Sequence, residues 1–179
     1  MTETILIDDA AQRSARLGEA GAAWAKRIAA NADNAKLTYK AAGVGVGSVA
    51  TRISAGRHQF TVDEPAALAG DDTAASPVEY ALGAIIACQV VVYRLYAEQL
   101  GIQVEDITIN AEGDLDVRGL FGIDESVRPG FSDIRLAVQI TGPETQERYE
   151  ELARTVEARC PVQDLFSNAT PVSAVVTKA

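Results

Sequence analysis

Hydrophobic residues follow one another almost without interruption from residue 80 to residue 100, and this run predicts one long helix. Just before it, Ser76 suits an N-cap, Pro77 suits the first helical position, and Glu79 stands where it completes a capping box. Gly101 is a suitable stop at the other end. Because so few residues in the run are polar, we expect protein to surround this helix on most sides.

Alternating hydrophobic and polar residues predict antiparallel strands on both sides of this helix. Residues 37–65 alternate in short runs separated by glycines, which is typical of strands joined by hairpins. Residues 104–111 and 134–140 alternate in the same way, and residues 171–178 predict a closing strand.

Two further segments have helical periodicity. Residues 10–36 are rich in alanine and carry one narrow stripe of larger apolar side chains, Leu17, Trp24 and Ile28. Residues 143–160 place apolar side chains on one helical face, and we expect this helix to end at Cys160 because Pro161 cannot continue it.

The order of elements indicates an α+β fold in which antiparallel sheets pack against two core helices. We assign residues 1–36 to an N-terminal helical extension and residues 37–179 to a single α+β domain. A chain of 179 residues is long enough for one well-buried core and short for two.

Charge and composition narrow the classes of partner. The chain has 25 acidic and 16 basic residues, a net charge of −9, so electrostatic binding to nucleic acid or to an anionic membrane surface is not expected. Gln89 and Arg94 interrupt the long apolar run, which argues against a membrane span. The acidic start, MTETILIDD, has no features of a signal peptide, and we expect a cytoplasmic protein.

The candidate chemistry rests on two cysteines, Cys88 and Cys160. They are 72 positions apart, and the single histidine, His58, falls in a predicted strand, so no metal site is expected. The acidic loop at 63–75 lacks the residue spacing of a calcium-binding loop and is interpreted as solvated. The segment GVGVGS lacks the Lys-Ser/Thr that ends a phosphate-binding loop. On composition and spacing alone, we expect both cysteines to be buried free thiols that pack as small hydrophobic residues.

Several segments taken together make the prediction more specific. VDEP and GDDTAASPVEYALGAIIAC, then AEGDLDVRG and RPGF, then ARCPVQDLFSNATPV, strongly resemble the OsmC/Ohr family of osmotically inducible and organic hydroperoxide resistance proteins. The resemblance covers about residues 40–177 and implies an intertwined homodimer with an antioxidant role in the oxidative stress response. It also implies that Cys88 attacks an organic hydroperoxide as a thiolate and that Cys160 resolves the sulfenic acid as a disulfide. No bound cofactor is implied, and the pair is restored by a dithiol reductant, often lipoyl-linked.

The residues themselves bear on this division of roles. A cysteine at a helix C-terminus is a poor thiolate, so the predicted position of Cys160 suits the resolving thiol. The neighbours of Cys88 one helical turn away are all apolar, which raises a thiol pKa, so its activating charge must come from elsewhere in the fold.

The resemblance implies that in the peroxidase members this charge is an arginine of the first hairpin, which a glutamate early in the helix orients. Counted without gaps, the arginine position falls near Gly47, and Arg52 and Arg57 are the nearest substitutes. We prefer Arg57 because it follows Gly56, where a sharp turn can direct it toward the helix. The glutamate position corresponds to Val78 in this chain. Glu79, nine residues before Cys88, should lie on the opposite side of the helix and point away from Cys88, and its capping role already explains it.

Two other functions remain open at this point. In one, the protein is a non-catalytic dimer that binds an apolar small molecule, with buried and unreactive cysteines. In the other, the helix carrying Leu17, Trp24 and Ile28 docks a partner in repair or stress assembly. Thiol reactivity near neutral pH separates the peroxidase from the first alternative.

Overall fold

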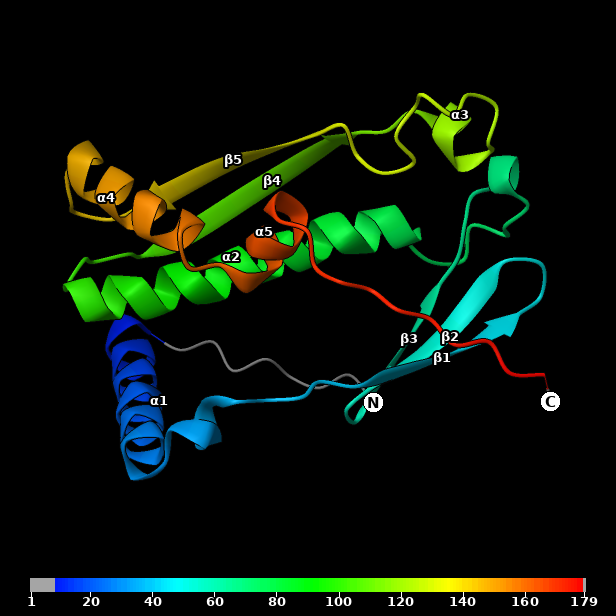
Figure 1. Ribbon diagram of the computed structural model, residues 1–179. Coiled ribbons are helices and arrows are strands. Elements are labelled where there is room, and N and C mark those ends of the chain that lie inside the picture. The colour runs from blue at the N-terminus through cyan, green and yellow to red at the C-terminus, as the bar shows by residue number, and fades with distance from the viewer. Residues whose placement is uncertain (1–8, 179) are drawn as a thin grey trace.

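The computed structural model describes residues 9–178 and shows a mixed α and β chain (Figure 1). The acidic start of the chain, for which we expect no signal peptide, lies almost entirely outside the described residues. Antiparallel strands form two separate sheets, and one long helix runs beneath the second of them (Figure 1). The predicted α+β class is confirmed.

The long helix is α2, Pro77–Leu100, and its ends are those that the sequence predicts. Ser76 and Glu79 form the capping box, Pro77 occupies the first turn, and Gly101 ends the helix with a φ of 62°. Its environment differs from the prediction, because within one chain α2 buries a single stripe, namely Ile85, Gln89, Val92, Tyr93 and Ala97. The opposite side is open, with Val91 56% exposed. The expectation that protein surrounds α2 on most sides is therefore wrong for the single chain.

By length and composition, α2 is also apolar enough to cross a membrane, a test that buried core helices pass as well. Its interior polar side chains are bonded to other parts of the chain. The Arg94 guanidinium donates to the carbonyl oxygens of Val104 at 2.9 Å and Glu105 at 3.2 Å. Such bonds fit a helix that packs on its own domain.

The first sheet consists of β1 (Ala41–Val46), β2 (Ala50–Ala55) and β3 (His58–Val62), antiparallel and in sequence order. The second consists of β4 (Asp106–Asp114) and β5 (Asp133–Thr141). The predicted hairpins are thus confirmed. The three-stranded sheet stands to one side of the rest of the molecule, and every residue of β1 is exposed (Figure 1).

The core lies where β4, α2 and α4 (Gln146–Glu157) meet. Leu152 and Val156 of α4 are completely buried there against the C-terminal half of α2. Along β5 every second residue is partly buried, as the alternation predicts. This core fixes the end of α4, and therefore the start of the segment that carries Cys160.

The C-terminal region corrects two predictions. Helix α4 ends at Glu157 rather than at Cys160, and Pro161 begins a further short helix, α5 (Pro161–Ser167). The physical reason is that proline breaks a helix interior but suits the first turn, where no N–H is needed. The predicted strand at 171–178 is absent from the described chain, and its valines are almost fully exposed.

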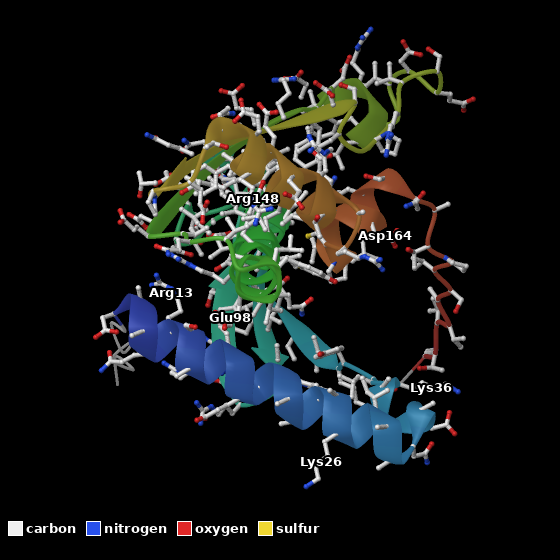
Figure 2. The ribbon with its side chains drawn as sticks, turned by 90° about the vertical axis from the view of Figure 1, so that its left-hand side faces the viewer. Arg13, Lys26, Lys36, Glu98, Arg148 and Asp164 are labelled. Carbon is white, nitrogen blue, oxygen red and sulfur yellow. The ribbon has the colours of Figure 1, made fainter. Side chains whose placement is uncertain are left out.

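The predicted N-terminal helix is α1 (Ala10–Ala30), unbroken at its glycines, and a short 3-10 turn, η1 (Ala32–Ala35), follows it. Helix α1 buries no residue completely and meets α2 near the C-terminal end of α2, where the Ser14 hydroxyl donates to the Glu98 carboxylate at 2.7 Å. Arg13 and Glu98 lie in this region, whereas Lys26 points away from the molecule (Figure 2). The remaining short elements, η2 (Ala66–Leu68) and α3 (Val117–Leu120), lie in loops.

Candidate active site

The two cysteines, far apart in the sequence, meet in the structure. Cys88 is half-buried in the middle of α2, and Cys160 is 2% exposed at the start of α5. Both are free thiols, Cys88 packs against the core cluster that contains Cys160, and the interaction between the two thiols raises the pKa of Cys88. The segment Ala158–Cys160, which links α4 to α5, brings the second thiol against α2.

Three influences act on the ionisation of Cys88. Burial raises its pKa most strongly, and the hydrogen bond and charge interaction with Cys160 raise it further. The backbone N–H of Val162 donates to the Cys88 sulfur and lowers the pKa, because it stabilises the thiolate. The net direction is upward, as its apolar neighbours in the sequence predict.

The position of Cys160 removes one argument for its role. Cys160 is the N-cap residue of α5, so it does not lie at the helix C-terminus that the sequence predicts. Its backbone N–H donates to Val156 of the preceding turn, and its carbonyl accepts from Asp164 of the following helix. The macrodipole argument that Cys160 is the poorer thiolate therefore does not hold, and its resolving role rests on the family resemblance.

The candidate activating residues lie away from the thiol pair. Arg52 is exposed in the middle of β2, and Arg57 follows Gly56, whose φ of 59° gives the sharp turn that the sequence predicts. Neither arginine is among the groups that shift the Cys88 pKa within the described chain.

Glu79 has a clear structural position. Its carboxylate accepts hydrogen bonds from the backbone N–H and the hydroxyl of Ser76, both at 2.7 Å. These bonds lower the Glu79 pKa. The capping box that the sequence predicts is confirmed, and it engages the carboxylate at the first turn of α2.

The acidic loop after β3 is not simply solvated. Within residues 9–178 no cluster of three or more suitable ligands is placed to hold a metal ion. Asp63 is buried and accepts hydrogen bonds from the backbone N–H groups of Asp71 and Thr73 and from the Thr73 hydroxyl. This carboxylate closes the loop in front of α2, which corrects the fully solvated interpretation.

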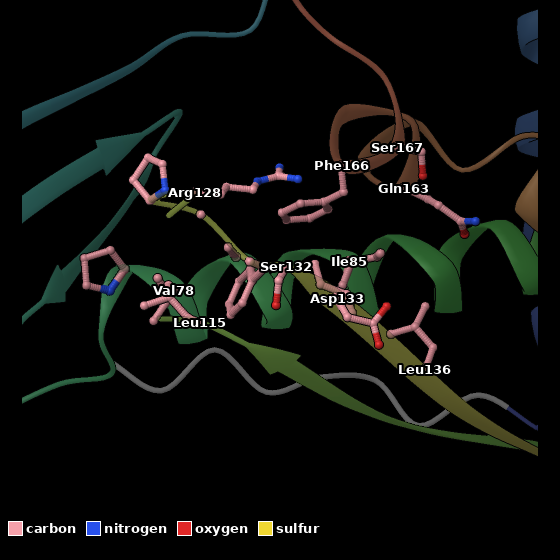
Figure 3. Close-up of a pocket in the computed structure, with 16 residues that line it drawn as sticks. Val78, Ile85, Leu115, Arg128, Ser132, Asp133, Leu136, Gln163, Phe166 and Ser167 are labelled. Atoms are coloured by element: carbon pink, nitrogen blue, oxygen red, sulfur yellow. The ribbon is translucent and has the colours of Figure 1, made fainter. Parts of the chain in front are cut away.

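A cavity of about 530 Å³ lies between the first half of α2, the start of β5 and α5 (Figure 3). Its walls include the apolar side chains of Ile85, Phe131 and Phe166, and Arg128 and Asp133 contribute charges of opposite sign. Ile85 precedes Cys88 by one helical turn. The cavity can therefore hold an apolar group against α2 one helical turn before Cys88, although neither cysteine is among its lining residues.

Gln89 and Gln163 complete the surroundings of the thiol pair. Gln89 follows Cys88 and is 2% exposed, and its side-chain amide donates to the Gln163 carbonyl oxygen on α5 at 2.5 Å. Sequence reasoning did not assign either residue to the site. The available signal was that Gln89 is the polar interruption next to the cysteine in an otherwise apolar helix.

Comparisons with known proteins bear on the family and the fold. The family model described as OsmC-like protein matches residues 70–175, more than half of the chain. Among solved structures, an OsmC-like protein from Mycoplasma pneumoniae is 20% identical with a TM-score of 0.64, covering 74% of this chain and 89% of its own. An organic hydroperoxide resistance protein from Legionella pneumophila is 22% identical with a TM-score of 0.58, covering 74% and 90%.

The organic hydroperoxide resistance protein OhrB of Bacillus subtilis is 23% identical with a TM-score of 0.53, covering 72% of this chain and 90% of its own. No curated protein matches the sequence. The structural likeness extends to proteins that resemble the chain only weakly in sequence, so it supports the fold, whereas the family model reaches both cysteines directly. The chain belongs to the OsmC-like protein family.

Proposed function

We propose that this protein is a thiol peroxidase that reduces organic hydroperoxides through Cys88 and Cys160. The observation that carries the proposal is the direct contact of the two thiols across α2 and α5. Membership of the OsmC-like family and the likeness to structures named as hydroperoxide resistance proteins support the same redox role. The alternative of a non-catalytic binder gains no support from a thiol pair placed in this way.

The reaction follows from the chemistry of a thiolate and a neighbouring thiol. The Cys88 thiolate attacks the peroxide oxygen, the O–O bond breaks, and the alcohol leaves after taking up a proton, so Cys88 becomes a sulfenic acid. The Cys160 sulfur then attacks the Cys88 sulfur, and water is lost as the disulfide forms. A dithiol reductant exchanges with this disulfide, becomes oxidised itself, and restores both thiols.

The cavity that begins one helical turn before Cys88 supports an organic hydroperoxide as substrate. Its volume of about 530 Å³ and its apolar walls suit a hydroperoxide with a sizeable organic group. Hydrogen peroxide would leave most of these walls without a partner. We expect organic hydroperoxides to react faster than hydrogen peroxide for this reason.

We further propose that the working form is an intertwined homodimer and that Arg57 of one copy activates Cys88. The exposed small and apolar side chains of α2, Ala84, Ala87 and Val91, together with the uncovered three-stranded sheet, support a second copy of the chain as the partner. A guanidinium near Cys88 would offset the upward pKa shift that burial imposes within one chain.

The test is a mass-spectrometric count of thiols after reduced protein is treated with slightly more than one equivalent of cumene hydroperoxide. We expect rapid loss of both thiols in the wild type and a sulfenic acid at Cys88 in Cys160→Ser. The Cys88→Ser variant should retain Cys160 as a thiol. Survival of both thiols in the wild type would refute the peroxidase proposal and return attention to a bound ligand.

A further inference from the structure

The short helix α5 controls the geometry of the thiol pair, and its packing on the core comes from its N-terminal end, where Cys160 is buried and Val162 is partly buried. It carries Cys160 at its N-cap and the Val162 N–H that bonds to Cys88, yet none of its seven residues is buried. A helix of this length is marginal on its own. Its position relative to α2 must therefore depend on a few specific contacts.

One side-chain hydrogen bond joins the two helices directly, from the Gln89 amide to the Gln163 side-chain oxygen. Gln89 is 2% exposed, so without Gln163 its amide would be left buried without this partner. The bond joins the residue after Cys88 to the third residue of α5, at the wall of the apolar cavity. It therefore fixes the part of α5 that carries the Val162 N–H.

We propose that Gln89 and Gln163 are positioning residues for the peroxidase cycle, which hold α5 so that Cys160 and the Val162 N–H both reach the Cys88 sulfur. Gln163 acts through the placement of α5, and Gln89 acts as its buried anchor. The inference rests on the proposed function for its second consequence only. Its first consequence, the ionisation of Cys88, holds whether or not the protein turns over a peroxide.

Two consequences follow from loss of the bond. If α5 shifts, the Val162 N–H no longer stabilises the Cys88 thiolate, so the Cys88 pKa rises. The Cα atoms of the two cysteines must also lie within about 7 Å for a disulfide to close. Closure therefore slows when α5 is not held in the position that brings Cys160 to Cys88. A bond that contributed only to folding would change neither property in the folded protein.

The first experiment measures the pH dependence of Cys88 alkylation by iodoacetamide, with Cys160→Ser as the background so that one thiol reacts. We expect Gln163→Met and Gln89→Met each to move the midpoint upward by roughly half a unit to one unit, the effect of losing one hydrogen bond to the thiolate. The double variant should show no greater shift, since both single changes break the same bond. Gln99→Met, at an exposed position of the same helix, should leave the midpoint unchanged.

The second experiment follows disulfide closure by rapid quenching in proteins that retain both cysteines. We expect Gln163→Met to slow disulfide closure roughly tenfold relative to formation of the sulfenic acid, because Cys160 is no longer held next to Cys88. Gln163→Glu should restore the closure rate, because its carboxylate still accepts from Gln89. Thermal unfolding of each variant verifies that the folded protein is compared.

The outcomes separate this inference from the proposed function. If the wild type forms no disulfide, the peroxidase proposal fails, and the alkylation profiles still test the role of the glutamine pair. If the wild type forms the disulfide but both single variants keep its alkylation midpoint and closure rate, the positioning role is overturned. Additive shifts in the double variant would also contradict it, because they would mean that the two residues act separately.

Discussion

Replacement of Arg57 by alanine tests how the buried thiol is activated. Within one chain, burial and Cys160 raise the Cys88 pKa, and the Val162 N–H opposes them. A guanidinium about 4 Å from a thiolate contributes about 4 kcal/mol at an effective dielectric constant of about 20, and about half of that at twice the distance. Because about 1.4 kcal/mol corresponds to one pKa unit, the unscreened effect is about 1.5 to 3 units.

Cys88 is only half-buried, so screening by solvent and salt reduces this range to about one to two units. The Arg57→Ala variant should therefore show an alkylation profile displaced to higher pH, and its rate at neutral pH should fall roughly tenfold to a hundredfold. The sign follows because loss of a cation disfavours the thiolate. The assay is iodoacetamide alkylation in the Cys160→Ser background, across the pH range.

Lys36→Ala is the matched control, since it removes one positive charge from an exposed position that precedes the three-stranded sheet. It should leave the profile in place, which separates a local effect from a change in net charge. An unchanged profile in Arg57→Ala would refute the activating role of Arg57. A shift confined to Arg52→Ala would assign the role to Arg52 instead.

Three further changes test the fold and the assembly. Leu152→Ala, at a fully buried position, should lower the free energy of unfolding by about 2–5 kcal/mol in urea titrations, whereas the exposed Val176→Ala should have little effect. The loop hydrogen bonds lower the pKa of Asp63, so its carboxylate stabilises the fold above its ordinary value of 3.8, and this contribution is lost as pH falls through the lowered pKa. The melting temperature of Asp63→Asn should therefore fall less steeply on acidification than that of the wild type, and equal slopes would contradict this role. Val91→Glu places a charge on the open face of α2 and should convert the proposed dimer to monomer in analytical ultracentrifugation, and a wild-type protein that sediments as a monomer would contradict the dimer itself.

Local signals in the sequence predict the elements well. The capping box of Ser76 and Glu79, the stop at Gly101 and the alternation in β5 depend on residues a few positions apart, so their outcome is already visible in the sequence. Pro161 shows the limit of such signals. Proline ends one helix and can begin the next, and only the tertiary structure shows that it does both here.

Contacts between distant segments could not be predicted from periodicity. The meeting of Cys88 and Cys160 came from the family resemblance, since nothing in their local sequence joins them. The bond from Gln89 to Gln163 was not predicted, because a glutamine in an apolar helix does not indicate which distant residue it binds. The division into an extension at 1–36 and a domain at 37–179 stays a prediction, although α1 lies within the predicted extension.

The proposed dimer accounts for both the exposed face of α2 and the raised pKa of Cys88. Hydrophobicity in the sequence shows that the α2 surface should leave water, but it does not show which molecule covers it. Within the described chain, the groups that act on Cys88 include no arginine, and Arg57 lies on a sheet whose first strand is fully exposed. A second copy that covers α2 with its own sheet would bury the apolar face and bring a guanidinium toward the thiol in the same step. On this proposal a single chain is not active by itself, so Val91→Glu should lower peroxidase activity in proportion to the loss of dimer, without any change at the cysteines.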